Sequence, residues 1–246
     1  MANERLVYDG LQQCPYLDGH VARMPLYRQA KYLGLEQADV RFQNQERRVG
    51  TCLYRPDCPT CSACRGIRIV VDDFSPTRSQ RRVMKRWRDR YRIEYGPPKC
   101  SPEVLRMYNA HKDQRGLRED GAGAMTAEGY IGWLVNSCFH TMEMRYYVDD
   151  RLVGLGVLDL GATAASSVYF FFDPSPDVSK LSPGVFSVLE ELAFCRATGR
   201  KYLYLGLYVR DCTELSYKRN YYPHERVEFG NWVRYDRRED DPHYQG

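Results

Sequence analysis

Apolar residues recur at two different spacings along this chain, and the change of spacing outlines its organisation. From about residue 142 the period is two, and residues 143–148, 152–160 and 166–172 predict three strands. The tight turn Asp149-Asp150 joins the first two, so we expect an antiparallel meander. Residues 202–209 predict one more short, buried strand.

The sequence also predicts three helices. One lies between the third and fourth of these strands, and two precede the first. A helix begins at Ser182-Pro183, where the serine is expected to cap it, and Gly199 stops it. Its apolar positions are Val185, Phe186, Leu189, Leu192 and Ala193. Ser101-Pro102 and Thr126 start two earlier helices. A strand, a right-handed crossover helix and a parallel strand make an acetyltransferase-type sheet, and the predicted class is α+β.

The first hundred residues carry weaker periodicity. Residues 41–54 alternate polar and apolar side chains, and we expect them to form a hairpin with the β-branched stretch 67–71, with a cysteine-rich turn between. We therefore predict a small cysteine-bearing N-terminal domain at residues 1–75. An acetyltransferase-like (GNAT) domain, a mixed sheet with flanking helices, is expected at residues 76–246.

Charge adds a local feature to this picture. The chain of 246 residues is 43% hydrophobic, enough for a substantial core, and its net charge is only +4. Residues 75–92 nevertheless hold eight Arg and Lys against one Asp, interleaved with Trp87 and Tyr91. Such local basicity favours a surface for a polyanion. A solvated helix face is the ordinary alternative.

Cysteine spacing adds a candidate metal site. No apolar run approaches the ~20 residues of a membrane helix, so we expect a cytoplasmic protein with reduced thiols and no membrane partner. Cys58, Cys61 and Cys64 follow one another at intervals of three among nine cysteines. Three thiolates at this spacing suit Zn²⁺ or an iron–sulfur cluster, and both want a fourth ligand. Small buried cysteines in a tight turn are the alternative.

Several short motifs together resemble one enzyme family. They are Cys14-Pro-Tyr-Leu-Asp-Gly19, Tyr54-Arg-Pro-Asp-Cys58-Pro-Thr-Cys61-Ser-Ala-Cys64, Ser79-Gln-Arg-Arg82, Tyr169-Phe-Phe-Phe-Asp-Pro174, Tyr202-Leu-Tyr-Leu-Gly206 and Tyr217-Lys218. In this order they resemble the aminoacyl-tRNA protein transferases of the N-degron pathway, the bacterial aspartate/glutamate leucyltransferases and, more distantly, the arginyltransferases. The resemblance implies transfer of leucine or arginine from its tRNA to proteins with N-terminal Asp or Glu, which marks them for degradation.

The chain departs from the bacterial pattern at a few positions. Asp18 and His20 stand where proline and arginine are expected, Arg65-Gly66 where proline and valine are usual, and Trp87 where asparagine is common. Leucine and arginine therefore both stay open as the donor.

The resemblance also implies roles for individual residues. It favours Cys14 as the fourth ligand beside Cys58, Cys61 and Cys64, with Cys52 behind it. Four cations, Arg78, Arg81, Arg82 and Lys85, are expected to contact tRNA phosphates or an acidic N-terminal residue, and Lys218 the tRNA 3′ end or the substrate carboxylate.

For the chemistry itself, Tyr169 and Tyr204 are candidates for the oxyanion or the leaving proton, and Asp173 and Glu143 for orienting the amine. No cofactor is expected for this reaction.

Two other functions fit parts of the sequence. A CoA-dependent N-acyltransferase of the same fold would use the helix start at Ser182 for a pyrophosphate, but no Arg/Gln-x-x-Gly-x-Gly/Ala run precedes that helix. A non-catalytic RNA-binding protein with a metal-stabilised arm needs only the cationic and aromatic residues.

Overall fold

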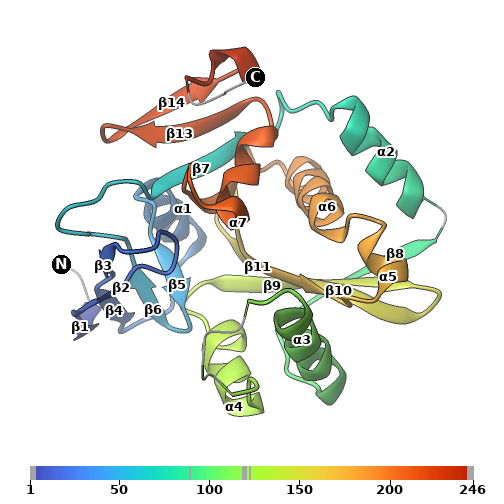
Figure 1. Cartoon of the computed structure of the whole chain (residues 1–246), viewed down its shortest axis with the longest axis horizontal. Coiled ribbons are helices and arrows are strands. Elements are labelled where there is room, and N and C mark those ends of the chain that lie inside the picture. Colours follow the sequence, from blue (N-terminus) through green and yellow to red (C-terminus); the bar gives the residue numbers. More distant parts are fainter. Residues whose placement is uncertain (1–3, 89, 118–120, 122, 243–246) are drawn as a thin grey trace.

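The computed structural model describes residues 4–88, 90–117, 121 and 123–242. Its centre is an eight-stranded mixed sheet in the order β14-β13-β7-β12-β11-β10-β9-β8 (Figure 1). The strands are β7 (Arg65–Val70), β8 (Tyr91–Gly96), β9 (His140–Val148), β10 (Arg151–Leu160), β11 (Ala164–Phe172), β12 (Tyr202–Tyr208), β13 (His224–Glu228) and β14 (Asn231–Tyr235). Among the described strand pairings of this sheet, β11–β12 alone is parallel. The α+β class predicted from the sequence is confirmed.

Helices cover both faces of this sheet (Figure 1). One face carries α2 (Arg78–Trp87), α5 (Pro176–Ser179) and α6 (Pro183–Ala197), and the stacked rings of Trp87 and Phe186 lie 4.4 Å apart. The other face carries α3 (Pro102–Gln114), α4 (Ala127–Tyr130) and the π-helical turn η1 (Ile131–Val135). After β12 come α7 (Thr213–Ser216) and the 3₁₀ turn η2 (Tyr217–Asn220), and η3 (Arg238–Asp240) follows β14.

The meander and the helix starts agree with the sequence patterns. β9, β10 and β11 pair antiparallel in that order, and β11 and β12 are neighbours across the crossover helix α6. Ser101 and Thr126 cap α3 and α4 through their side chains. At α6, Ser182 stands at the start in a left-handed conformation and makes no side-chain cap, so its capping role was predicted wrongly.

The N-terminal part holds a second, smaller sheet in the order β1-β4-β6-β5. Its elements are β1 (Glu4–Tyr8), β4 (Leu26–Gln29), α1 (Leu35–Gln43), β5 (Arg47–Val49) and β6 (Cys52–Tyr54), and β2 (Leu11–Gln13) pairs separately with β3 (Val21–Arg23). The predicted hairpin between residues 41–54 and 67–71 is wrong. β5 and β6 pair with each other, whereas β7 lies between β12 and β13.

β7 ties the two parts of the chain together. It belongs by sequence to residues 1–75, yet it is an inner strand of the eight-stranded sheet, and Ile67 and Ile69 are fully buried there. Helix α1 packs beside the same sheet, where Phe42 contacts the ring of Tyr204. The division at residue 75 therefore stays a prediction. Across the described residues, no helix is both long and apolar enough to cross a bilayer.

Candidate functional site

The two parallel strands of the sheet separate soon after they meet. β11 and β12 pair only from Ala164 to Ser166, opposite Tyr202 to Tyr204. Beyond that point β11 has a bulge at Val168, where its register with β10 shifts, and β12 has an irregularity before Gly206. Bulges bend strands and turn backbone groups away from the ladder. The two strands are therefore unpaired beyond Ser166, and we call the place where they part the split.

Arg47 of β5 extends into the split. Its Nη2 donates to the carbonyl of Val168 at the bulge, at 3.3 Å. A Cβ atom at Gly206 would lie 1.1 Å from Nη1 of Arg47, and Gly206 has a φ of +78°, so both space and backbone require glycine there. A guanidinium carries five N–H donors, and this bond uses one. Arg47 can therefore still form a forked pair of bonds with an anion.

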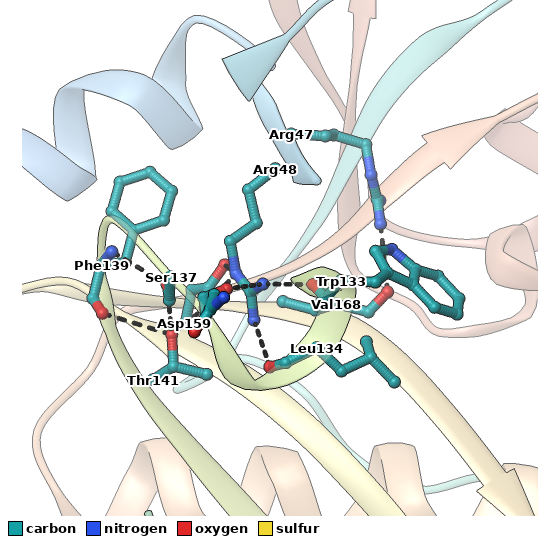
Figure 2. Close-up of polar contacts among 10 residues, drawn as sticks. Arg47, Arg48, Trp133, Leu134, Ser137, Phe139, Thr141, Asp159 and Val168 are labelled. Atoms are coloured by element: carbon teal, nitrogen blue, oxygen red, sulfur yellow. Dashed lines mark hydrogen bonds and ion pairs between the residues drawn. The ribbon is translucent and has the colours of Figure 1, made fainter. Parts of the chain in front are cut away.

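Next to it, Arg48 is fully committed to the protein interior (Figure 2). Its Nε lies 2.8 and 2.9 Å from the two carboxylate oxygens of Asp159 on β10, and Thr141 donates to the same carboxylate at 2.6 Å. The remaining guanidinium nitrogens donate to the carbonyls of Trp133, Leu134 and Asn136 at the end of η1. No side-chain surface of Arg48 is exposed. The pair fixes β5 against β10.

Strand geometry explains why these neighbours act differently. Successive side chains of a strand point to opposite sides, so the burial of Arg48 turns Arg47 toward Val168 and the split, as Figure 2 shows. The following turn is equally constrained. A Cβ at Gly50 would lie 2.3 Å from the carbonyl oxygen of Gly132, and the Gly50 N–H donates to the carbonyl of Trp133. The backbone of β5 thus has little freedom to shift.

A second cation lies close to Arg47. Lys218 of η2 is only 8% exposed, and its Nζ donates to the carbonyl of Leu207 at 2.7 Å. Burial lowers the pKa of this amine well below its usual value, and the nearby positive charge of Arg47 lowers it further. On the α1 side, the space beside Arg47 is only about 10 Å³. That volume holds about one water molecule, so it offers no room for a carboxylate ligand on this side.

Tyr217 stands beside Lys218 in η2, and 44% of its surface is exposed. Burial raises the pKa of its hydroxyl, the charge of Glu191 on α6 adds to this rise, and Arg115 and Arg47 oppose it. Because much of the ring still contacts water, the shift is smaller than a fully buried tyrosine would show. Charged groups just after α3 and on β5 and α6 therefore all act on Tyr217.

The three residues predicted to be catalytic lie in separate places. Tyr169 is on β11 beside the bulge, with its ring 4.9 Å from that of Trp133. Glu143 is fully buried on β9, where it accepts hydrogen bonds from Arg145 and the Lys99 backbone, and burial raises its pKa. Asp173 follows β11 and accepts from the Ser175 N–H at 2.9 Å. Only Tyr169 adjoins the split, and the roles of all three stay predictions.

The cations predicted to bind tRNA or substrate also divide into two groups. Arg78, Arg81, Arg82 and Lys85 are all exposed on α2, whose buried side holds Gln80, Val83 and Trp87. The side chain of Gln80 donates to the carbonyl of Asn220, so the first turn of α2 lies against the end of η2. η2 thus carries the buried Lys218 and contacts α2, the helix that carries the exposed cations.

Tyr204, predicted to bind the substrate, is buried on the α1 side of β12. Its hydroxyl accepts from Arg68 at 2.7 Å and bonds Gln43 at 3.1 Å, and burial raises its pKa. The ring lines an open pocket of about 280 Å³ between α1 and the start of β12, on the far side of the sheet from η2.

The cysteines predicted to hold a metal lie near one another. Burial raises the pKa of the Cys64 thiol to about 12, and the thiols of Cys14, Cys58, Cys61 and Cys212 add to this shift. The set is chemically suited to a thiophilic ion. Within the described residues, however, no three Cys, His, Asp or Glu side chains are arranged as ligands of one ion. The closeness of the four thiols and their chemistry fit a metal ion. The distances between their sulfur atoms, as the side chains stand, do not.

Sequence reasoning missed the position of Arg47 in the split and its anchor at Arg48 and Asp159. Arg47 and Arg48 stand in a short strand without strong periodicity, and Asp159 is 111 residues away from Arg48 in the chain. One usable signal was the glycine at position 206 in an otherwise large, apolar strand, because such a glycine often marks the close approach of another group.

Two family models match this chain. The model described as "Arginine-tRNA-protein transferase, N terminus" matches residues 12–82, and "Arginine-tRNA-protein transferase, C terminus" matches residues 103–228. Among curated proteins, the aspartate/glutamate leucyltransferase of Aeromonas hydrophila is 32% identical over 240 residues, covering 96% of this chain and 98% of the relative. That of Gluconacetobacter diazotrophicus is 33% identical, covering 91% of this chain and 85% of the relative.

Solved structures give weaker similarities. FemX aligns with a TM-score of 0.43 and 8% identity over 81% of this chain and 79% of its own. The C-terminal domain of a putative lysylphosphatidylglycerol synthetase from Agrobacterium fabrum aligns with a TM-score of 0.44 and 14% identity, covering 60% of this chain and 47% of that one.

Proposed function

The chain belongs to the arginine-tRNA-protein transferase family, and on that basis we propose that it transfers leucine from Leu-tRNA to the α-amine of proteins that begin with Asp or Glu. The enzyme class is that of an aminoacyl-tRNA protein transferase. Leucine is favoured over arginine because the relatives that match nearly the whole chain are named leucyltransferases. Proteins that receive leucine in this way would be degraded through the N-degron pathway. Because the donor is a charged tRNA, we place the protein in the cytoplasm.

The observation that carries this proposal is Arg47 in the split. The acceptor differs from other protein chains because its first residue carries both the α-amine and a side-chain carboxylate. A planar guanidinium binds a carboxylate through two parallel hydrogen bonds. Arg47 is held in place by the anchored strand β5, and among the described residues its guanidinium donates one hydrogen bond, to the carbonyl of Val168. Its free donors would hold the Asp or Glu side chain so that the α-amine lies in the split.

Lys218 would strengthen this preference for acidic termini. It is buried close enough to Arg47 that the guanidinium lowers the pKa of its amine. An anion bound beside both groups would favour the charged form of the Lys218 amine and offset its repulsion by Arg47. An uncharged Asn or Gln at the acceptor terminus would not supply this gain.

The tRNA would bind over α2. The exposed cations Arg78, Arg81, Arg82 and Lys85 offer phosphate contacts that need no base recognition, and the first turn of α2 adjoins η2. The aminoacylated 3′ end then reaches the split from the direction of Tyr217. By contrast, Arg86 and Trp87 of α2 donate to the carbonyls of Lys180 and Leu181, just ahead of α6, so this helix start is partly covered.

Positioning can supply much of the rate in this reaction. An α-amine has a pKa of about 7.7 to 8.0, so a large fraction is already neutral near pH 7.5. Holding the amine against the ester carbonyl makes the attack effectively unimolecular. The oxyanion that forms needs a hydrogen-bond donor, and the hydroxyl of Tyr169, the residue after the bulge, is our candidate. Glu143 and Asp173 would orient the amine indirectly, by fixing the positions of β9 and of the end of β11.

A metal at the cysteines remains part of the proposal on chemical grounds. Cys14, Cys58, Cys61 and Cys64 would hold Zn²⁺ or an iron–sulfur cluster, and its contribution would be to fold the segment around Tyr16. No step of the transfer involves it.

A transfer assay tests the proposed function. Purified protein is mixed with radiolabelled Leu-tRNA or Arg-tRNA and with peptides that begin with Asp, Glu, Asn or Lys. We expect labelled product from Leu-tRNA with the Asp and Glu peptides. Binding of tRNA without any labelled peptide would contradict the proposal and indicate a non-catalytic RNA-binding protein, and product from acetyl-CoA instead would indicate a CoA-dependent enzyme.

A further inference from the structure

Glu191 is a buried acid that the mechanism above leaves without a task. It lies on the side of α6 that faces the sheet and is 0% exposed. One carboxyl oxygen, Oε1, is 3.3 Å from the hydroxyl of Ser167. The other, Oε2, has no hydrogen-bond partner among the described residues. A buried carboxyl that is neither paired nor fully hydrogen-bonded is costly, and such groups often serve a function.

The position of Glu191 connects it with the split. Ser167 is the residue that directly follows the last pairing of β11 with β12, and it precedes the bulge residue Val168 that binds Arg47. Gly156 of β10 lies next to the acid, since a Cβ built there would stand 3.6 Å from Oε1, an ordinary van der Waals distance. Arg47 and Glu191 therefore reach adjacent residues of one strand at the point where it leaves its neighbour.

We infer that Glu191 holds the proton that leucine transfer moves, and exchanges it with the reacting groups through the hydroxyl of Ser167. This inference rests on the proposed function and assigns the proton transfer within the same site. A serine hydroxyl can donate one hydrogen bond while it accepts another, which is what a relay requires. Glu191 thus stores the proton and acts through Ser167, whose hydroxyl is the group that contacts the substrate.

The protons and bonds balance without another reactant. The amine nitrogen forms a bond to the leucyl carbonyl carbon, and the bond from that carbon to the ribose oxygen breaks. The neutral acid passes its proton through Ser167 to the departing ribose oxygen. Its carboxylate then takes the proton that the former amine nitrogen must lose, so Glu191 ends as it began.

The electrostatic setting favours this exchange. Burial raises the pKa of Glu191 to about 8, against a small lowering by Ser167. That value is close to the α-amine pKa of about 7.7 to 8.0, so a proton moves between the two groups at little cost. The titratable groups that Glu191 influences from the surrounding elements are Tyr146 on β9, Cys195 on α6, Tyr217 on η2 and Tyr221 after it. All four are uncharged at neutral pH and none can pair with a carboxylate as a cation.

The substitution Glu191→Gln tests the inference because it keeps shape and hydrogen bonding but cannot release a proton. Leucine transfer to an Asp peptide is measured between pH 6 and 9. We expect kcat to fall about 100-fold or more, while KM for the peptide changes less than about threefold. The kcat of the unaltered protein should decline as pH rises through about 8, when Glu191 ionises, and the variant should lack this decline.

Two neighbours give matched controls. Glu190→Gln alters a carboxyl on the same helix that accepts from Tyr91, and Ser187→Ala alters a hydroxyl one turn earlier on α6. Both should keep the kcat and the pH profile of the unaltered protein. Ser167→Ala should lose kcat as Glu191→Gln does, and it decides the question if Glu191→Gln does not fold.

Unchanged kcat and an unchanged pH profile in Glu191→Gln, or unchanged kcat in Ser167→Ala, would overturn the inference. The proposed function fails separately, because that failure appears as an unaltered protein that transfers no leucine at all.

Discussion

Two cationic regions of this protein differ in almost every physical respect. The arginines and lysine of α2 are exposed, flexible in principle and open to solvent ions, whereas Arg47 and Lys218 lie in or near the split with fixed partners. Exposed charges attract a polyanion over a distance but discriminate weakly, and salt screens them. Enclosed charges act over a short range and demand a matching group.

This difference suggests a division of labour along the tRNA. The exposed region would bind the nucleic acid without reading its sequence, and the enclosed region would choose the acidic protein terminus. η2 connects the two, because Gln80 of α2 donates to the carbonyl of Asn220 and Lys218 of the same turn donates to the carbonyl of Leu207 on β12. Changes in the enclosed region should therefore affect chemistry and stability, and changes in the exposed region mainly affinity for tRNA.

The largest effect is expected at the anchor of the enclosed region. Asp159→Asn leaves the buried guanidinium of Arg48 without its counter-charge, and breaking such a pair costs about 3–5 kcal/mol. Urea denaturation should show this loss in the free energy of unfolding. The control Asp177→Asn removes an exposed partner of Arg151 and should change stability by less than about 1 kcal/mol. Equal losses in the two variants would contradict the assigned difference between buried and exposed pairs.

Next in size is the loss of acceptor selection at Arg47. The variant Arg47→Met keeps a long side chain but no donors, and we expect transfer to Asp peptides to fall about 100-fold, as for the loss of a charged hydrogen bond. Transfer to Asn peptides should change far less. The exposed Arg55→Met serves as the control. A variant at position 47 that still prefers Asp over Asn would remove Arg47 from carboxylate binding.

A third effect concerns stability and pH. Burial raises the pKa of Glu191 to about 8, above its ordinary value of 4.5, so the folded protein keeps a proton that the unfolded chain releases between these values. Stability should therefore decline by about 1.4 kcal/mol per pH unit from this group as pH rises from about 5 to 8. Glu191→Gln should lack this contribution, and chemical denaturation at several pH values measures it. Parallel pH dependence in both proteins would mean that Glu191 titrates normally.

The smallest effect is expected on α2. The double variant Arg82→Gln/Lys85→Gln removes two exposed cations, and we expect roughly tenfold weaker tRNA binding at low salt with a log–log salt slope reduced by about two. At saturating tRNA, kcat should be unchanged. Fluorescence titration at several salt concentrations tests this. A fall in kcat with unaltered affinity would place α2 in the chemistry and end the division proposed here.

The sequence predicted the parts of the fold that local patterns determine. Period-two apolar residues gave the meander β9–β11, and Ser101 and Thr126 gave the helix starts, because pairing and capping depend on neighbouring residues. The hairpin prediction for residues 67–71 failed for a physical reason. A continuous β-branched run is typical of an inner strand buried on both faces, and β7 has neighbours on both edges that follow it by more than a hundred residues.

The site was less accessible to sequence reasoning. The exposed cations of α2 were identified because they form a dense run, whereas Arg47 depends on the anchor at Asp159 and the opening beside Gly206, both remote in the chain. Lys218 was found through a motif, but its burial against Leu207 was not foreseen. Long-range packing decides these features, and the local pattern does not encode it.

The account is tested most directly by one comparison of acceptors. Unaltered protein is given radiolabelled Leu-tRNA with two peptides that differ only in a first residue of Asp or Asn. We predict rapid transfer of leucine to the Asp peptide and about 100-fold slower transfer to the Asn peptide, with Arg47→Met nearly abolishing the difference. Equal rates for both peptides, or leucine left entirely on its tRNA, would contradict the central claim.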